Sequence, residues 1–98
     1  MNKIVNILRI ANKARGIVVG EDLVLKGIRN KSIKIVILAN DCGPNTTKRI
    51  TNKSLFYDIK LITCLNSEQI ENALGKVGRK VIGVTNQGFA DSILKHLE

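Results

Sequence analysis

The sequence predicts an α/β fold in which helices cover both faces of a four-stranded sheet. Short runs of β-branched and aliphatic residues alternate with segments of helical periodicity, and one of these runs is apolar at nearly every position. Such a strand is expected where layers of helices cover both faces of a sheet. The chain has 98 residues, of which 44% are hydrophobic, so we expect one globular domain spanning residues 1–98.

The N-terminal part of the chain predicts helix, strand, helix and strand in turn. An amphipathic helix is expected over Asn2–Lys13, because apolar residues recur along one side and polar or basic residues along the other. Gly16 ends this helix, and Ile17–Val19 forms a short strand. Glu21–Arg29 follows as a second helix, whose two leading acidic residues suit the positive end of its dipole. The continuous apolar run, Ser32–Ala39, is the second strand.

The middle of the chain continues the alternation. Asp41–Pro44 has the composition of a turn, and either Asn45 or Thr46 can cap a third helix that runs to about Tyr57. Lys60–Cys64 is the third strand. This stretch therefore predicts a turn, a helix and a strand, which extends the pattern of the N-terminal part.

The C-terminal part adds a helix, a strand and a last helix. Asn66 or Ser67 caps the fourth helix and Gly75 ends it. Val81–Thr85 is the fourth strand. The last helix is expected from an apolar stripe at helical spacing, made of Phe89, Ile93 and Leu97. The order of the four strands in the sheet does not follow from this pattern.

The charge of the chain favours a polyanionic partner. Sixteen Lys and Arg against eight Asp and Glu give a net charge of +8, and the pI is about 9.9. In so small a domain this excess points to RNA or DNA. No segment has the ~20 apolar residues of a membrane span, and the N-terminus lacks the uninterrupted apolar core of a signal peptide. We therefore expect a cytoplasmic protein with no membrane partner.

The cysteine and histidine content argues against a metal or disulfide framework. Cys42 and Cys64 are isolated, and neither belongs to a C-x-x-C pair, so both are expected to be reduced thiols. His96 is the single histidine, which leaves a metal site or a Ser-His arrangement little to build on. We expect no metal, no cofactor and no small-molecule substrate.

The segment after the second strand is close to a catalytic phosphate loop, C-x5-R, which starts here at Cys42. In such a loop the cysteine attacks a phosphate that backbone N–H groups and an arginine hold. Here Lys48 stands in the arginine position, Arg49 comes one residue late, and Pro44 removes one N–H group. We expect a tight turn rather than a cysteine phosphatase, and no enzyme.

The segment Gly20–Lys26 is the most informative candidate for a binding site. A glycine between a strand and a helix lets a ligand backbone come close, because it has no side chain. The helix start presents free N–H groups, which suit a phosphate or a polar base edge. Lys26 lies one turn beyond Asp22 on the same helix face. This arrangement indicates nucleic-acid binding rather than catalysis.

Two further loops are candidates. Asn40–Pro44 follows a strand expected to be buried, and Gly75–Lys80 joins the fourth helix to the fourth strand. The second of these combines two glycines, three cations and one apolar side chain, Val77. Cations can neutralise phosphates, and Val77 can pack against an unstacked base or a ribose. The alternative is an ordinary solvated loop after a helix.

The aromatic content indicates how nucleic acid would be recognised. Phe56, Tyr57 and Phe89 are the only aromatic residues, and their apolar helical positions favour the core over a stacking surface. A binder of single strands that relies on base stacking is therefore not favoured. A protein with many cations and few aromatics is expected to read the shape and backbone of a folded RNA. We expect no large exposed apolar patch, and a monomer.

Three blocks and their spacing resemble one family over essentially the whole chain. The blocks are Gly20–Lys26, Ile35–Asp41 and Ala73–Val77. They resemble the kink-turn RNA-binding ribosomal proteins of the L7Ae superfamily, in particular its small bacterial branch, the YlxQ-like proteins. The resemblance implies a three-layer α-β-α sandwich with a four-stranded mixed sheet. It also implies a non-enzymatic, ribosome-associated RNA-binding protein that recognises a kink-turn or a similarly bent RNA.

The family pattern at the first block is G-x-N-E-x-x-K, and Gly20 and Lys26 match it. The resemblance implies a close backbone approach at Gly20 and a guanine or phosphate contact for Lys26. The family asparagine and glutamate read the sheared G·A pairs of the kink-turn, but this chain has Asp22 and Leu23 there. An aspartate accepts hydrogen bonds and cannot donate them, and the Leu23 side chain can do neither. Val77 resembles the apolar residue that the family lays against the extruded nucleotide.

The predicted RNA interface therefore has a centre, a flank and a periphery. The centre lies at the start of the second helix, the flank in the third loop, and the periphery on neighbouring cations and one asparagine. The centre comprises Gly20, Glu21, Asp22 and Lys26. The flank comprises Lys76, Val77, Gly78 and Arg79, and the periphery comprises Lys13, Arg15, Arg29 and Asn40. The partner is expected to be structured RNA, most simply ribosomal RNA. The alternative is a protein-interaction module whose same surface binds an acidic protein.

Overall fold

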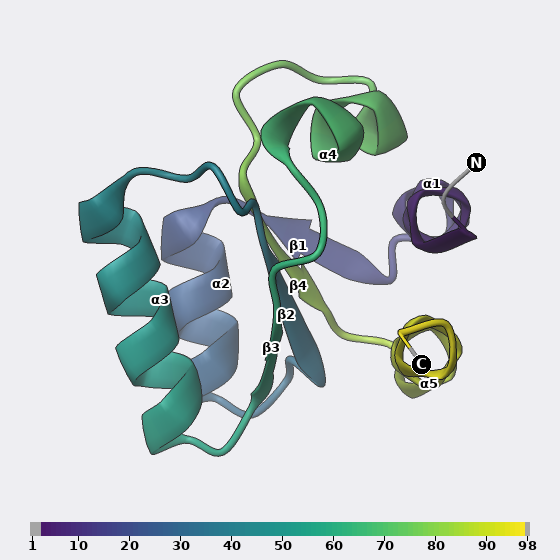
Figure 1. Cartoon of the computed structure of the whole chain (residues 1–98). Helices are drawn as coiled ribbons and strands as arrows, with labels where there is room; N and C mark the ends of the chain where they lie inside the picture. Colours follow the sequence, from purple (N-terminus) through teal and green to yellow (C-terminus); the bar gives the residue numbers. More distant parts are fainter. Residues whose placement is uncertain (1–2, 98) are drawn as a thin grey trace.

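The computed structural model describes residues 3–97, in which five helices alternate with four strands (Figure 1). The helices are α1 (Lys3–Lys13), α2 (Glu21–Arg29), α3 (Pro44–Phe56), α4 (Ser67–Leu74) and α5 (Gln87–Lys95). The strands are β1 (Ile17–Val19), β2 (Ile35–Leu38), β3 (Lys60–Ile62) and β4 (Val81–Val84). Asn2, which was expected to begin the first helix, lies outside the described residues.

The sheet is mixed, with the strand order β1-β4-β2-β3. β4 is antiparallel to both β1 and β2, while β2 and β3 are parallel. Val19 of β1 pairs with Ile82, and Leu38 of β2 pairs with Val81. The start of β4 therefore lies between the ends of β1 and β2. The segments that join β1 to α2, β2 to α3 and α4 to β4 meet at this end of the sheet.

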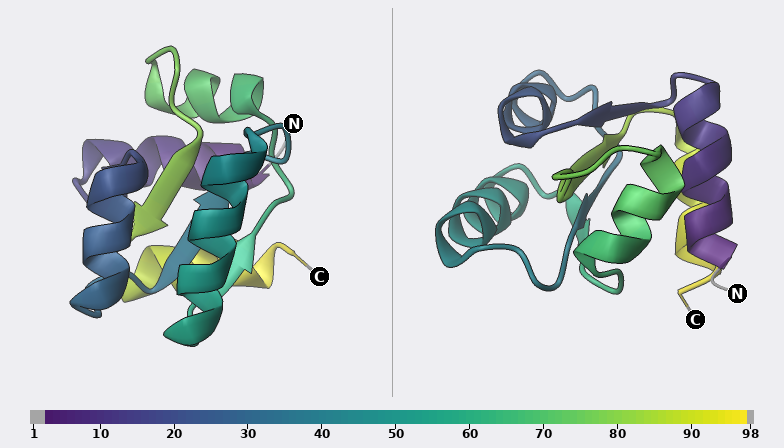
Figure 2. Two further views of the ribbon diagram at one scale, coloured as in Figure 1. Left: turned by 90° about the vertical axis from the view of Figure 1, so that its left-hand side faces the viewer. Right: turned by 90° about the horizontal axis from the view of Figure 1, so that it is seen from above.

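The helices form a layer on each face of the sheet, which confirms the predicted α-β-α sandwich. α2 and α3 cover one face, and α1, α4 and α5 cover the other (Figures 1 and 2). β2 is buried at all four positions: Val36 and Leu38 pack with α2 and α3, while Ile35 and Ile37 pack with the opposite layer. This alternation explains why the strand is apolar throughout.

The helix ends follow local side-chain chemistry. Asn66 caps α4 as predicted: its side chain accepts from the Gln69 backbone N–H, and the Gln69 side chain accepts from the Asn66 N–H. Gly75 ends α4 with a left-handed φ of 70°, also as predicted. The predicted Asn45 or Thr46 cap of α3 is wrong. The cap is Gly43, and Pro44 occupies the first helical position, where a missing N–H costs nothing.

Three of the four strands are shorter than predicted. The predicted strands Ser32–Ala39, Lys60–Cys64 and Val81–Thr85 are each trimmed to the residues that pair along the sheet. The backbone N–H of Ala39 still donates to the carbonyl of Lys80 at 2.8 Å, so the chain stays tied to the sheet beyond the end of β2. Hydropathy alone had predicted these flanking residues to be part of the strands.

Two predictions of core positions near helix ends are wrong. Phe56 is 79% exposed at the end of α3, where its ring meets that of Tyr57 edge to face, with the ring centres 5.0 Å apart. Leu97 lies beyond the end of α5 and is 38% exposed. Phe89 and Tyr57 are partly buried against the core, as expected. A helical period identifies a face only while the helix continues and a neighbour covers it.

Candidate nucleic-acid interface

Three segments that are far apart in the sequence meet at the end of the sheet. The backbone N–H of Gly20 donates to the carbonyl of Val81 at 3.0 Å, and this bond joins the start of α2 to the start of β4. A surface hollow of about 190 Å³ lies where the segments meet. It is lined by parts of the three candidate segments, Gly20–Lys26, Asn40–Pro44 and Gly75–Lys80, and by the starts of α3 and β4. The lining residues are Gly20, Glu21, Cys42, Thr46, Gly78, Arg79, Lys80 and Val81.

The start of α2 presents its backbone and three side chains to solvent. Gly20 caps the helix with a φ of 102°, which L side chains rarely adopt, although a Cβ atom there would meet nothing within 4 Å. Glycine is therefore required by backbone conformation rather than by space. Asp22, Leu23 and Lys26 are all exposed, and Leu23 keeps 55% of its surface accessible.

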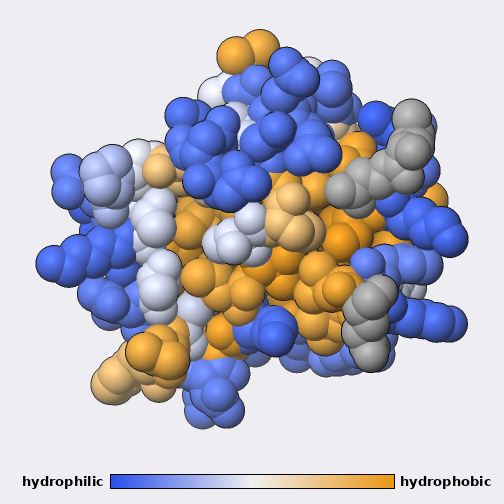
Figure 3. Space-filling view, viewed as in Figure 1, coloured by the Kyte–Doolittle hydropathy of each residue, from blue (hydrophilic) through white to orange (hydrophobic). Residues whose placement is uncertain are grey.

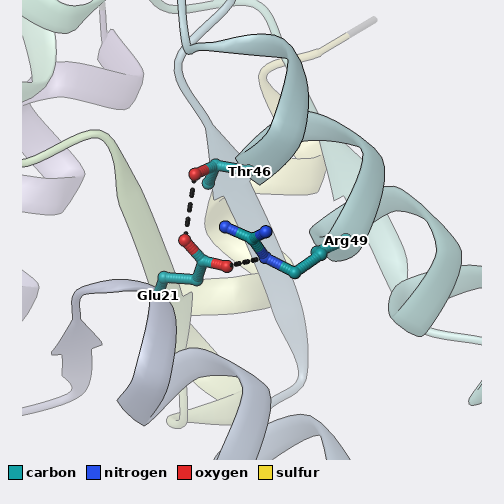
Figure 4. A network of polar contacts seen from close by, with 3 residues as sticks. All are labelled: Glu21, Thr46 and Arg49. Carbon is teal, nitrogen blue, oxygen red and sulfur yellow. Dashed lines mark hydrogen bonds and ion pairs between the residues drawn. The ribbon is translucent and has the colours of Figure 1, made fainter.

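Glu21 is held by contacts within the protein. Its carboxylate accepts a hydrogen bond from the Thr46 hydroxyl at 2.9 Å and forms an ion pair with the guanidinium of Arg49 (Figure 4). The Arg49 hydrogen bond holds the pKa of the Glu21 carboxyl below its ordinary value, and Glu21 raises the pKa of Arg49. These contacts fasten the first turn of α2 to the first turns of α3.

The loop between α4 and β4 is fully open to solvent. All six residues from Gly75 to Lys80 are exposed, and Val77 is 88% exposed. Gly78 has a φ of 82°, and its backbone N–H donates to the Glu71 carboxylate at 2.7 Å. The loop thus turns on two left-handed glycines and presents its cations and Val77 outward.

A second hollow is also lined by residues of both Gly20–Lys26 and Gly75–Lys80. It measures about 440 Å³ and runs beside β1, which is an edge strand. Arg79 lines both hollows. The residues that line the second hollow are Asn12, Ile17, Val18, Val19, Leu23, Leu74, Lys76 and Arg79. Leu23 from the start of α2 thus faces the same space as Lys76 and Arg79 of the loop.

The predicted peripheral residues are more scattered. Lys13 is exposed next to Asn12, at the end of α1, and Asn40 is exposed just after β2. Arg15 precedes β1, at the opposite end of that strand from Gly20. Arg29 ends α2 and lies roughly 13 Å along the helix axis from Gly20. None of these four residues lines either hollow, although Lys13 and Arg15 lie between Asn12 and Ile17, which both line the second.

Several residues that line the hollows were not in the predicted interface, among them the polar residues Thr46 and Asn12. Thr46 lines the first hollow from the first turn of α3, and Asn12 lines the second from the last turn of α1. No signal in the sequence identified Asn12, since its place depends on how α1 packs across the sheet. The preference of threonine for the first turn of a helix marked Thr46 only as a cap.

The loop after β2 is tied to the protein rather than arranged as a phosphate cradle. The Asp41 carboxylate accepts from the backbone N–H and the hydroxyl of Ser67, at 2.9 and 2.6 Å, which lowers the Asp41 pKa. Arg49, the basic residue of the near C-x5-R match, is committed to Glu21. Both cysteines are free thiols; Cys42 is half-buried, and partial burial raises the pKa of the exposed Cys64.

Among residues 3–97 no three His, Cys, Asp or Glu side chains are grouped so that they could hold a metal ion. None of the helices in the same range is long and apolar enough to cross a membrane.

Known proteins similar to this chain point to one family. "RNA-binding protein YlxQ" of Bacillus subtilis (strain 168) is 39% identical over 92 residues, which is 94% of this chain and 92% of that protein. "RNA-binding protein YlxQ" of Enterococcus faecium is 34% identical and covers 98% of this chain and 92% of its own length.

Solved structures share the fold. A protein with unknown function from Bacillus halodurans C superimposes with a TM-score of 0.94 at 32% identity, covering 99% of this chain and 98% of that one. The Giardia lamblia 15.5kD RNA binding protein gives a TM-score of 0.82 at 14% identity, over 95% of this chain and 80% of that one. The second likeness concerns the fold alone.

Residues 2–94, nearly the whole chain, match the pattern of one protein family. The similarity to the two YlxQ proteins over nearly the whole chain agrees with that match. The chain belongs to the Ribosomal protein L7Ae/L30e/S12e/Gadd45 family.

Proposed function

We propose that this protein is a non-enzymatic RNA-binding protein that recognises a kink-turn or a similarly bent structured RNA. The observation that carries the proposal is the junction of two glycine-bearing segments, Gly20–Lys26 and Gly75–Lys80, which share two hollows on a chain of net charge +8. A positive, recessed backbone surface suits a strand that bends sharply and brings its phosphates together. The names of the two YlxQ relatives support RNA as the partner.

The start of α2 forms the centre of the proposed interface. Gly20 leaves the backbone uncovered, so an RNA strand can approach the free N–H groups of the first helical turn. Lys26 stands one turn further on and donates to a guanine edge or a phosphate. Asp22 accepts hydrogen bonds from guanine N–H groups. Glu21 fixes the angle between α2 and α3, and so positions the centre for the RNA.

The loop Gly75–Lys80 forms the flank. Lys76 and Arg79 neutralise phosphates, and Gly78 lets a backbone come close. Val77, which is 88% exposed, packs against a base or ribose turned out of the stack. The peripheral cations Lys13, Arg15 and Arg29 and the polar Asn40 add long-range attraction and outer contacts.

The proposed targets extend beyond the standard kink-turn. Where the family pattern has asparagine and glutamate, Asp22 cannot donate and Leu23 cannot form side-chain hydrogen bonds. These two side chains therefore offer fewer hydrogen-bond donors and acceptors to sheared G·A pairs, while the cations of the surface still attract phosphates. We propose a variant kink-turn or another bent element of ribosomal RNA, bound by a monomer in the cytoplasm.

A filter-binding titration at two salt concentrations tests the proposal. The probes are a kink-turn RNA, the same RNA with its G·A pairs replaced by Watson–Crick pairs, and a plain duplex of equal length. We expect binding that weakens steeply with salt and prefers both bulged RNAs to the duplex. Equal affinity for the duplex, or binding that salt leaves unchanged, contradicts the proposal. Weak binding to all three RNAs favours the alternative, an acidic protein at the same surface.

A further inference from the structure

A second surface, at the far end of α3, has the properties of a binding site for a partner. Leu55 and Phe56 are neighbours in the sequence and each is 79% exposed, although both are large and apolar. Figure 3 shows an apolar protrusion at the lower left of the molecule, at the end of α3 where these residues lie. Adjacent exposed apolar side chains are costly in water and mark interaction surfaces.

A hollow of about 390 Å³ adjoins this end of the helix. It is lined by the last turns of α3, the turn that follows and the start of β3: Thr51, Ser54, Leu55, Asp58, Ile59, Lys60 and Leu61. β3 is the last strand of the sheet and pairs only with β2 among the described strands. An edge strand beside an apolar hollow is a natural place for another chain to add itself.

Ser54 supplies an independent observation. The residue is 1% exposed, yet its hydroxyl has no hydrogen-bond partner among the described residues. A buried polar atom without a partner is unusual in a folded protein and costs free energy. Ser54 lines the hollow, so a small shift in its walls would let the hydroxyl donate to an acceptor brought by a partner.

The charge around the surface selects the partner. Lys60 lines the hollow together with Asp58, and Lys53 lies in the last turn of α3, so cations outnumber the acidic residue at this end of the helix. With a net charge of +8, a second copy of the chain would be repelled. A nucleic acid would leave the aliphatic side chains that line the hollow, Leu55, Ile59 and Leu61, unmatched. An acidic segment with apolar side chains matches both the cations and the hollow.

We propose that the end of α3 and the edge of β3 form a docking surface for a short acidic protein segment that inserts apolar side chains into the hollow. The surface is separate from the proposed RNA interface. Thr46 lines the RNA-side hollow and Leu55 lines this one, and nine residues of α3 place them roughly 13 Å apart along its axis. The protein can therefore hold RNA and a protein segment at the same time.

Selection from random displayed peptides tests this proposal. The full chain is the target, and the double variant Leu55→Ser and Phe56→Ser is the counter-target, shown to be folded by its thermal unfolding. We expect enriched peptides that combine Asp or Glu with Leu, Ile, Val or Phe, and an affinity at least about tenfold weaker for the double variant. Ile10→Ser, at a 59% exposed apolar residue on α1, is the matched control and should change nothing.

The remaining outcomes are each decisive. If no peptide binds the wild-type chain better than the double variant, the docking surface is overturned. Enrichment of basic or uncharged peptides overturns it too. Oligouridine that binds the wild type and is lost in the double variant would assign this surface to RNA and overturn it as well. Kink-turn RNA should bind the double variant and the wild type with equal affinity. Failure of the docking-surface proposal would therefore leave the proposed RNA function intact.

Discussion

The two glycine-bearing segments of the proposed interface differ in how firmly the fold holds them. Gly20–Lys26 is fastened on two sides, since Gly20 donates to Val81 and Glu21 is held by Thr46 and Arg49. Gly75–Lys80 is exposed at every position, and the bond from Gly78 to Glu71 is its main side-chain tether. Changes in the first segment should therefore disturb both the fold and RNA binding, whereas changes in the second should affect binding alone.

The largest effect is expected at Lys26. Lys26→Ala should weaken RNA binding by about 1–3 kcal/mol if the ammonium contacts a base. If it contacts only a phosphate, the slope of log affinity against log salt should fall by about one. Titrations of the bent RNA at several salt concentrations measure both quantities. Arg29→Ala, at the other end of α2, is the matched control and should lose less; equal losses would remove Lys26 from the centre.

The next effect concerns the backbone of the anchored segment. Gly20→Ala places a side chain at a φ of 102°, which should lower the free energy of unfolding by about 1–2 kcal/mol. Gly43→Ala is the control, because Gly43 also caps a helix with open space around it but has an ordinary φ of −60°. Urea unfolding of both variants tests the difference, and a Gly20 variant as stable as the Gly43 variant would contradict it.

The exposed loop should show the opposite behaviour. Combined Lys76→Ala and Arg79→Ala changes should reduce the salt slope of RNA binding by about two and leave the unfolding free energy unchanged. Lys34 and Lys95 are exposed cations at other places on the surface, and their double alanine variant serves as the control. A salt slope that stays constant in the loop variant would show that the loop does not contact phosphates.

The smallest effect is expected from the Glu21 ion pair. The pKa of Glu21 is lowered in the folded state, so its stabilising contribution is present above the ordinary glutamate pKa. It is lost as the pH falls through the lowered value. Glu21→Gln should therefore flatten the loss of stability on acidification, as measured by thermal unfolding across that range. Asp41, whose pKa is also lowered, should leave a residual dependence; an unchanged profile would show that the pair contributes nothing.

The sequence predicted the elements well because their signals are local. The Asn66 cap, the Gly75 stop and the apolar run around β2 depend on a few adjacent residues, and all three were confirmed. The start of α3 was missed because proline at a first helical position competes with the better-known caps that follow it. Phe56 was misplaced because its helix face ends without a covering neighbour.

The junction of the loops depends on information that local patterns do not contain. Gly20 and Gly78 line one hollow because β4 inserts between β1 and β2, and the strand order did not follow from hydropathy. Local residue patterns supplied the candidate segments and the resemblance to the family added to them, whereas the fold shows which of them are adjacent. Arg29 carries the right charge but lies at the far end of α2 from Gly20, which the charge content of the sequence does not reveal.

Backbone amide chemical shifts of the isotope-labelled protein, followed during titration with the bent RNA, test the central claim most directly. The account predicts that amides in Gly20–Lys26 and Gly75–Lys80 shift together and saturate with one dissociation constant, while those around Lys31–Lys34 stay in place. Shifts confined to one of the two segments, or two different dissociation constants, would contradict a single interface built from both.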